Sequence, residues 1–293
     1  MQRFATRAVL ALSAGHARAL SASPQRAWTA PPHRVASNFP ATADAALRNA
    51  DSEAVFVVTG ANRGIGAAMV ADLVARTRGT IFACARDPAS VAAASGRVRP
   101  VALDVRDDGS IGALPGAVGG RVDALIHCAG VLHRGGERER RPERSLASVD
   151  RAWLLESFDV NCAGPLLVTR ALRAALDARK RRYPSYVASL SARVGSISDN
   201  GLGGWYSYRG SKAAQNMATR TMAIELRRQD TRCVALHPGT TETALSAPFA
   251  RNVRPEKLFP APFSAKQLLD ICDGLKDRHS GAFFGWDGEA IDF

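Results

Sequence analysis

The amino-acid sequence predicts an α/β fold, built as a doubly wound parallel sheet in one domain. Early in the chain, an apolar strand, a glycine-rich turn and an amphipathic helix follow one another without a linker. Further along, short apolar runs alternate with segments of helical periodicity, which is the order that gives parallel strands with helical crossovers. No internal repeat or second domain boundary interrupts this order, so we assign all of these units to one sheet.

Composition narrows the class of protein before any motif is considered. The hydrophobic content is 46%, which suffices for a large core. No stretch reaches the ~20 consecutive apolar residues of a transmembrane helix. The net charge of +12 is spread along the chain, without a basic helix carrying interleaved aromatic residues. The five cysteines lack paired spacing and indicate free thiols in a reducing compartment. We therefore expect no nucleic-acid, membrane or metal partner.

The first fifty residues differ in composition from the rest of the chain. They are rich in Ala, Ser and Arg, and no acidic residue precedes Asp44. This composition is typical of an organellar transit peptide. We predict a targeting peptide or disordered extension over 1–50 and a single folded domain over 51–293, located in a mitochondrion or plastid. A secretory signal competes for the same stretch, and without a targeting signal the protein would be cytoplasmic.

Each predicted strand is a short apolar run that a turn signal closes. The run at 54–58 is continuous rather than alternating, which predicts a strand buried on both faces. Further strands are predicted at 80–84, 98–103, 122–128, 186–190, 233–236 and 281–286. Helices are predicted from Ile65 onward, at 146–159, at 162–180 and at 207–228, with Asn161 as a break between two of them. Residues 246–262 are expected to form a lid over the substrate.

The turn after the first strand has the pattern T-G-x-x-x-G-x-G, formed by Thr59, Gly60, Gly64 and Gly66. Glycines allow a tight turn and a close backbone approach, and the helix N-terminus offers free N–H groups to a pyrophosphate. A glycine pattern alone has low specificity, and an ordinary strand–turn–helix unit is the competing interpretation.

The second strand carries information on which dinucleotide binds. Folds that prefer NAD place an acidic residue ~20 residues past the glycines, where it holds the ribose 2′-hydroxyl. Here Cys84 stands near that position, Arg86 follows, and Arg63 lies inside the glycine turn. Two guanidinium groups favour a 2′-phosphate, so we predict NADP, with NAD less favoured. Solvated surface arginines are the alternative.

A Tyr and a Lys stand four residues apart at the start of a predicted helix. Tyr208 and Lys212 therefore lie on one helix face. An ammonium near a phenol favours the phenolate and lowers the pKa of the hydroxyl. Tyr208 is thus a candidate general acid for protonating a developing alkoxide. The neighbouring Tyr206 has Gly210 at the fourth position instead of a lysine.

These motifs occur together in a fixed order along the chain, and over residues 53–293 the sequence resembles the short-chain dehydrogenase/reductase family. The stretch 190–226, LSARVGSISDNGLGGWYSYRGSKAAQNMATRTMAIEL, is similar to the branch of bacterial C-factor proteins and sniffer-type carbonyl reductases. The resemblance implies a Rossmann fold and an oxidoreductase that transfers a hydride between NADP and a carbonyl or hydroxyl group.

The resemblance also implies roles for individual residues. Tyr208 would be the acid/base, Lys212 would bind the nicotinamide ribose as well as tune Tyr208, and Asn161 would help to hold a proton-relay water. The cofactor turn would comprise Thr59, Gly60, Asn62, Arg63, Gly64, Ile65 and Gly66. Other cofactor contacts would come from Arg86, Asp104, Val105, Ala129, Gly130, Pro238, Gly239 and Thr243.

Two departures from the family pattern bear on function. Cys128 stands where the family has an asparagine before Ala-Gly. Ala192 stands where the family has its catalytic serine, with Ser191 next to it and Ser196 just beyond. We expect Ser191 to orient the substrate, with Ser196 or no serine as the alternatives. The favoured function is an NADP-dependent carbonyl reductase acting on a small carbonyl or alcohol, and a homo-oligomer is left open. The alternative is a cofactor-binding signalling or scaffold protein with little turnover.

Overall fold

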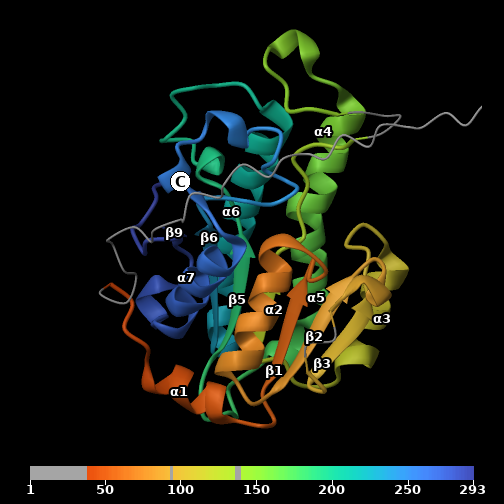
Figure 1. Ribbon diagram of the computed structural model, residues 1–293. Coiled ribbons are helices and arrows are strands. Elements are labelled where there is room, and N and C mark those ends of the chain that lie inside the picture. The colour runs from red at the N-terminus through yellow and green to blue at the C-terminus, as the bar shows by residue number, and fades with distance from the viewer. Residues whose placement is uncertain (1–37, 93–94, 136–139) are drawn as a thin grey trace, which may run out of the picture.

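The central element of the protein is a parallel sheet with its strands in the order β3-β2-β1-β4-β5-β6-β9 (Figure 1). The computed structural model describes residues 38–92, 95–135 and 140–293. The strands of the sheet are β1 Val55–Thr59, β2 Thr80–Ala85, β3 Val98–Ala102, β4 Ala124–His127, β5 Ser185–Leu190, β6 Thr231–His237 and β9 Phe283–Gly285. The predicted fold class is confirmed, and each predicted strand overlaps an observed one.

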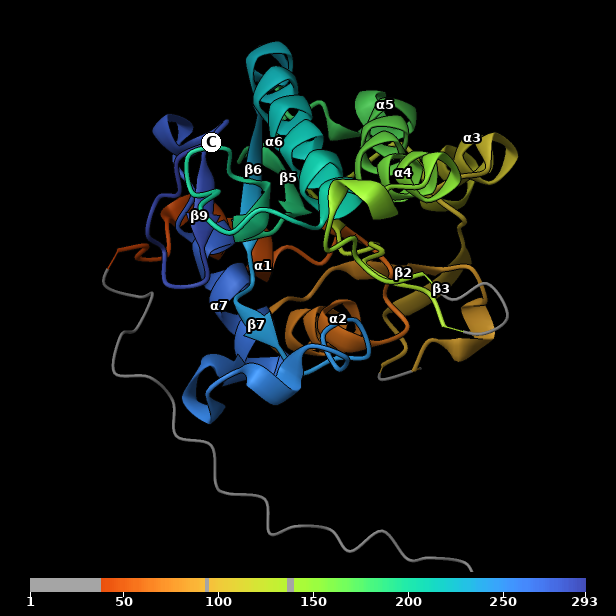
Figure 2. The ribbon, with the colours of Figure 1, turned by 90° about the horizontal axis from the view of Figure 1, so that it is seen from above.

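Helices cover both faces of the sheet, as Figure 2 shows from above. One face carries α2 Gly64–Arg76 and α7 Ala261–Asp273, and the other carries α3 Asp108–Val118, α4 Arg151–Phe158, α5 Gly164–Leu176 and α6 Tyr206–Leu226. The continuous apolar runs of the strands follow from this burial. In β1, Phe56 and Val58 pack into one core layer while Val57 packs into the other.

The order in which successive strands are added to the sheet reverses between β1 and β4. β1 pairs with β2 on one side and with β4 on the other, and Thr59 aligns with both Cys84 and His127. The loops after β1 and β4 therefore leave the same edge of the sheet toward opposite faces. A crevice at such a point is where open α/β sheets bind ligands.

Several elements differ from the sequence-based prediction. The helix break predicted at Asn161 is a π-helical segment, Asp159–Ala163, which joins α4 and α5 into one continuous helical rod. Helix α7 was not predicted, and it overlaps the end of the expected lid. Within that lid, β8 Leu258–Phe259 pairs with β7 Thr240–Thr241 as a separate two-stranded unit. Short 3₁₀ segments lie at 88–90, 146–148, 193–195, 227–229, 250–252, 255–257 and 277–279.

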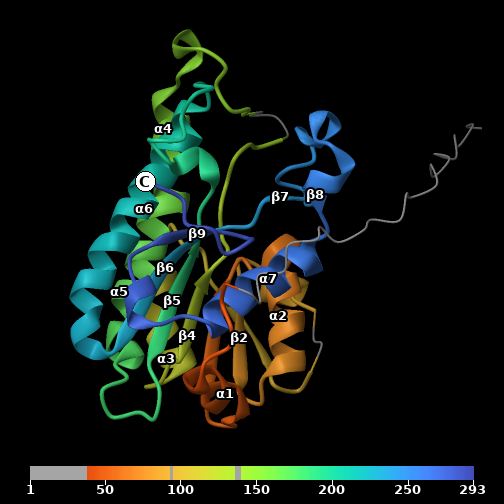
Figure 3. The same cartoon turned by 90° about the vertical axis from the view of Figure 1, so that its left-hand side faces the viewer.

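The described part of the N-terminal region packs on the domain. Helix α1, Ala43–Ala50, lies near α7 at the end of the sheet away from α4 (Figure 3). Phe39 is only 4% exposed, and Arg48 forms an ion pair of 2.9 Å with Asp273 of α7. Residues 38–50, which were predicted to belong to the extension, therefore contact the rest of the domain. The predicted targeting stretch before residue 38 lies outside the described residues.

Two further findings concern the described ranges alone. None of their helices combines the length and the apolar character that crossing a membrane requires. Nor do their His, Cys, Asp and Glu side chains gather into a group that could hold a metal ion.

Candidate functional site

A cleft of about 730 Å³ lies at the carboxyl ends of the central strands. Its size is that of a small-molecule or cofactor site. Among the residues that line it are most of those predicted from the sequence: Gly60, Asn62, Arg63, Gly64, Ile65, Gly66, Arg86, Asp104, Val105, Ala129, Gly130, Ser191, Tyr208, Lys212, Pro238 and Thr243. Three predicted residues, Thr59, Asn161 and Gly239, are not among them. The fold thus brings segments from across the chain to one site.

The glycine turn forms a cradle that side chains would fill. Gly60 and Gly64 have φ values of +64° and +55°, a conformation that suits glycine. A Cβ at Gly66 would stand 2.2 Å from the carbonyl oxygen of Gly60, so the turn can close only with glycine at this position. Helix α2 begins here, and its N-cap residue Arg63 makes no side-chain capping bond. The first N–H groups of α2 are therefore available to a phosphate, and the turn fits a dinucleotide.

Two of the predicted cofactor residues support the cleft from behind. The Thr59 hydroxyl accepts hydrogen bonds from the backbone N–H groups of Cys128 and Ala129, at 3.2 and 3.3 Å. It thereby joins the loop after β1 to the loop after β4. Gly239 has a φ of +73°, and a Cβ there would come within 2.5 Å of the Phe259 ring. Thr59 and Gly239 thus support the segments that line the cleft but do not line it themselves.

The end of the cleft beside β2 is cationic. Arg86 follows directly after the strand and is exposed, as is Arg63, and neither guanidinium donates a hydrogen bond to any described residue. The nearest acid in sequence, Asp87, does not line the cleft, and its side chain caps the short helical turn at Ala89. Asp104 is held by hydrogen bonds from Arg106, which lower the pKa of its carboxyl. Both arginines are thus available to a 2′-phosphate.

The catalytic helix α6 is capped by a residue that the sequence analysis missed. Trp205 precedes α6 with φ +55° and provides no side-chain cap. Instead, the buried carboxylate of Glu143 accepts hydrogen bonds from the Ser207 N–H, at 3.2 Å, and from the Ser207 hydroxyl. A carboxylate at a helix N-terminus satisfies free N–H groups and the helix dipole. Because Glu143 lies more than sixty residues away, no local sequence signal marks it.

The geometry of Tyr208 and Lys212 differs from the expectation in one respect. The two side chains share a face of α6, with Lys212 Nζ 5.8 Å from the centre of the Tyr208 ring. However, Lys212 Nζ donates to the Leu190 carbonyl at 2.7 Å and to Gln215 Oε1 at 2.9 Å. Burial raises the pKa of Tyr208 above its ordinary value and lowers the pKa of Lys212 to about 7. The predicted lowering of the Tyr208 pKa is therefore not present in this arrangement, because the ammonium is directed elsewhere.

Asn161 acts on the backbone around the site. Its side chain accepts from the Val131 N–H at 2.8 Å and donates to the Val131 carbonyl at 2.9 Å. The same amide donates to Ser211 Oγ of α6 at 3.0 Å. Asn161 lies in the π-helical segment, a feature that is frequent at functional sites. Its side chain thus fixes the loop after β4 against the catalytic helix.

The serine positions are arranged differently from the expectation. The Ser191 hydroxyl donates to Asn216 Oδ1 of α6 at 2.6 Å, although Ser191 does line the cleft. The Ser196 hydroxyl donates to the Asp292 carbonyl and lies outside the cleft lining. In this arrangement the proton of the Ser191 hydroxyl is donated to Asn216, and the role of Ser191 in orienting a carbonyl oxygen stays a prediction.

Aromatic side chains lie beside Tyr208. The Trp205 ring lies 6.2 Å from the Tyr208 ring and 5.0 Å from the Phe249 ring. Phe249 in turn lies 6.1 Å from His133, which lines the cleft. An aromatic group thus connects Tyr208 with His133, both of which line the cleft. Phe249 falls within the stretch predicted as a lid, whereas no periodic pattern marked Trp205 or His133.

Known proteins share both the sequence and the fold of this chain. The family profile described as short chain dehydrogenase matches residues 54–254. The C-signal protein of Myxococcus xanthus is 38% identical over 172 residues, which cover 59% of this chain and 93% of that protein. The NADPH-bound carbonyl reductase from chicken fatty liver has a TM-score of 0.73 at 28% identity, covering 85% of this chain and 98% of that one.

The carbonyl reductase Sniffer of Drosophila melanogaster has a TM-score of 0.72 at 22% identity, covering 83% of this chain and all of that one, which shows the shared fold. The resemblance inferred from the motifs is thereby confirmed. The matched region contains the glycine turn, the Tyr208–Lys212 pair and the loops that meet at the cleft. The chain belongs to the short-chain dehydrogenase/reductase family.

Proposed function

We propose that this protein is an NADP-dependent carbonyl reductase, which transfers a hydride between the nicotinamide and a carbonyl or hydroxyl substrate. The observation that carries the proposal is the position of the Tyr208–Lys212 pair in the same cleft as the glycine cradle. The NADPH-bound chicken carbonyl reductase, with which this chain shares its fold over nearly the whole of that protein, supports it.

The preference for NADP is supported by the charge at the β2 end of the cleft. Arg63 and Arg86 line it, and the exposed Asp87 is directed into a local turn. An acid that receives the ribose 2′-hydroxyl of NAD would stand near the tip of β2, where this chain has Cys84 followed by Arg86. A guanidinium there attracts a 2′-phosphate by charge and by paired hydrogen bonds.

The protein's part in the reaction is a proton transfer next to a held cofactor. NADP(H), when bound, supplies or accepts the hydride at the carbonyl carbon. Burial raises the pKa of Tyr208, so its hydroxyl keeps its proton at neutral pH and can donate that proton to the carbonyl oxygen. Lys212, within the same site, provides a positive charge beside the developing alkoxide.

The test is the oxidation of NADPH by the purified protein with aldehydes, ketones and quinones. Tyr208→Phe removes the proton donor but keeps the ring, so turnover should fall ~100-fold or more while NADPH binding persists. Tyr206→Phe is the matched control, because Tyr206 stands two residues away on the same helix, is 41% exposed and lies outside the cleft. Equal turnover of the two variants would overturn the proposed mechanism.

One observation favours a second candidate function. The Ser191 hydroxyl donates to Asn216, and Ala192 has no hydroxyl, so neither of these two residues donates a hydrogen bond into the cleft. A cofactor-binding signalling or scaffold protein with little turnover would have such a site. Tight NADPH binding without reduction of any carbonyl would favour this candidate, and restored turnover in Ala192→Ser would show that the missing hydroxyl was the cause.

We also propose that residues 1–50 contain an organellar targeting signal, on the basis of their arginine-rich composition without an acid before Asp44. A fusion of residues 1–50 to a fluorescent protein should enter a mitochondrion or plastid. Diffuse cytosolic fluorescence would contradict targeting and would place the protein in the cytoplasm.

A further inference from the structure

Lys212 is held by two acceptors from the protein itself. Its ammonium donates to the Leu190 carbonyl at the end of β5 and to Gln215 Oε1 one turn along α6. Lys212 is buried, and a buried ammonium is unfavourable unless its hydrogens are bonded. The Leu190 contact is made by a backbone carbonyl, which would be present whatever residue stood at position 190. The Gln215 contact is the part that this particular sequence provides.

Gln215 is poorly explained as a packing residue. It is 2% exposed, and its Nε2 atom has no hydrogen-bond partner among the described residues. A buried amide with an unpaired donor is destabilising, whereas an apolar side chain of similar size would avoid that loss. Residues that break a packing rule in this way are expected where the function requires them. The contact that remains to explain Gln215 is its bond to Lys212.

The layer between the sheet and α6 contains other buried polar atoms. His127 and Ser189 are register partners on β4 and β5, and each stands two positions after a residue, Leu125 or Val187, that packs into the core layer of α5 and α6. His127 Nδ1 and Ser189 Oγ, like Gln215 Nε2, have no partner within the described part of the chain. The titratable groups around Lys212 are Tyr208 on its own helix, Cys162 on the π-helical segment, and His127 and Cys128 at the end of β4.

None of those groups is an anion that would hold the ammonium. Burial and the charge of Lys212 lower the pKa of His127 to about 3, so His127 is neutral at physiological pH. Burial raises the pKa of Cys128 and of Cys162, so both thiols keep their protons. Burial likewise keeps Tyr208 protonated. The positive charge of Lys212 therefore depends on the neutral acceptors that it contacts.

We propose that Gln215 is a positioning residue, whose side-chain carbonyl holds the Lys212 ammonium against the Leu190 carbonyl at the floor of the cleft. The inference rests on the proposed function only for the role of Lys212 in the reaction. Gln215 does not line the cleft, and it acts through Lys212. It fixes where the charge stands relative to Tyr208, and it raises the fraction of Lys212 that is protonated near neutral pH.

The direct test is a titration of Lys212 followed by NMR. The full chain contains only the lysines Lys180, Lys212, Lys257, Lys266 and Lys276, so labelling lysine with ¹³C at Cε gives few signals. A Lys212→Met protein assigns the signal of interest. Gln215→Leu removes the acceptor and should lower the titration midpoint of Lys212 by about one pH unit, the size of a lost bond to a charged group. Gln215→Glu keeps an acceptor and adds a negative charge, so it should raise the midpoint by about one unit or more.

Thr219→Val is the matched control. Thr219 is buried on the same helix face, and its hydroxyl bonds the Gln215 backbone carbonyl rather than Lys212, so the midpoint should stay unchanged. A midpoint that moves in neither Gln215 variant would overturn the proposal. If Gln215→Leu fails to fold, the Gln215→Glu protein decides alone, and a midpoint that does not rise refutes the positioning role.

Kinetics give a second readout. The pH profile of kcat/KM for NADPH-linked reduction should shift in the same direction as the NMR midpoint in each Gln215 variant, whereas a merely structural role would reduce the rate without moving the profile. The two hypotheses fail separately, because the NMR titration needs no turnover. If the protein reduces no carbonyl but the Lys212 midpoint shifts in the Gln215 variants, the reductase function is refuted and the positioning role of Gln215 stands.

Discussion

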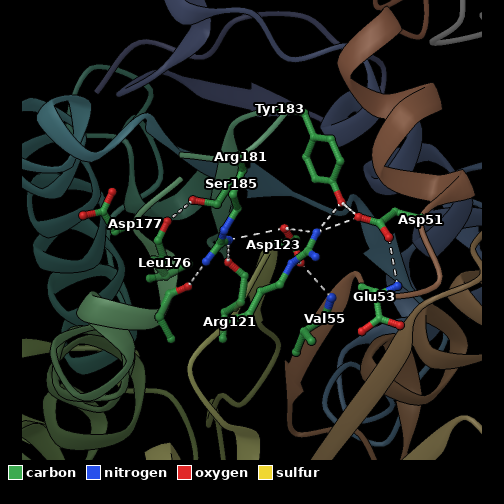
Figure 4. A network of polar contacts seen from close by, with 12 residues as sticks. Asp51, Glu53, Val55, Arg121, Asp123, Leu176, Asp177, Arg181, Tyr183 and Ser185 are labelled. Carbon is green, nitrogen blue, oxygen red and sulfur yellow. Dashed lines mark hydrogen bonds and ion pairs between the residues drawn. The ribbon is translucent and has the colours of Figure 1, made fainter. Parts of the chain in front are cut away.

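The clearest prediction for stability concerns Asp123, at the edge of the sheet opposite the cleft. Figure 4 shows its carboxylate between Arg121 and Arg181. It accepts from the Val55 N–H at 2.8 Å, from Arg121 Nε at 2.8 Å and from an Arg181 nitrogen at 3.3 Å. Its side chain is 0% exposed, so this cluster ties together the amino ends of β1, β4 and β5 away from water.

Asp123→Asn keeps the size of the side chain but removes its charge. Removing one partner of a buried ion pair typically costs about 3–5 kcal/mol. Arg121 keeps its ion pair with Asp51, and Arg181 keeps bonds to the Val122 and Ala175 carbonyls. The low end, about 3 kcal/mol, therefore applies. In a domain of this size, that loss corresponds to a fall in Tm of roughly 6–12 °C.

The assay is urea unfolding together with a thermal scan. The urea midpoint should fall with an unchanged m-value, because the surface exposed on unfolding stays the same. The affinity for NADPH at 20 °C should not change, since the cleft lies at the other edge of the sheet. Asp177→Asn is the control, because Asp177 pairs with the exposed Arg179, and such surface pairs contribute little.

One result would refute this reasoning. If Asp123→Asn lowers Tm no more than Asp177→Asn, then the buried charge cluster does not stabilise the sheet, and the strands are held by their apolar faces and ladder bonds alone. A loss of NADPH affinity without a loss of stability would be equally incompatible with the separation of the two edges.

Two further predictions concern the cofactor and pH. Arg86→Ala should weaken NADPH binding about tenfold and leave NADH binding nearly unchanged, since an exposed charge-assisted contact lies near the low end of the ~1.5–3 kcal/mol scale. Equal affinities of the unmodified protein for NADPH and NADH, measured by calorimetry, would contradict this. Burial by itself would raise the pKa of Asp51, but hydrogen bonds from Tyr183 and Arg121 outweigh it and lower that pKa to about 2. Because the folded pKa is below the unfolded one, the contribution of Asp51 to stability is complete above about pH 4 and is lost as the pH falls toward 2. In Tyr183→Phe, the free energy of unfolding measured between about pH 4 and pH 2 should depend less steeply on pH. An unchanged slope would show that the Tyr183 hydroxyl does not lower the pKa of Asp51.

Much of the fold was predictable because its signals are local. The continuous apolar run of β1, the glycines that follow it and the periodic start of α2 lie within about twenty-five residues, and together they indicate a strand, a tight turn and a helix. Tyr208 and Lys212 were recognisable for the same reason, since the spacing of four places them on one face of whatever helix contains them.

The prediction was wrong or incomplete where remote segments compete for one group. The sequence cannot show whether the Ser191 hydroxyl faces a substrate or Asn216, because that depends on how closely α6 approaches the end of β5. The sequence likewise places Lys212 near Tyr208 but does not reveal that the Leu190 carbonyl and Gln215 take its hydrogens. In each case the acceptors that receive the donor's hydrogens are decided by the side chains and carbonyls that packing brings within reach.

The sequence by itself thus determined the class of fold and the order of its units, because periodicity and glycine geometry act over a few residues, and its resemblance to the family indicated most of the predicted residues that line the cleft. Only the tertiary structure decided how α1 packs on α7, how the Glu143 carboxylate caps α6, and where the ammonium of Lys212 points. These features depend on contacts between segments that are far apart in the chain. Their energies come from burial and hydrogen bonding, which exist only once the sheet and its helices have packed.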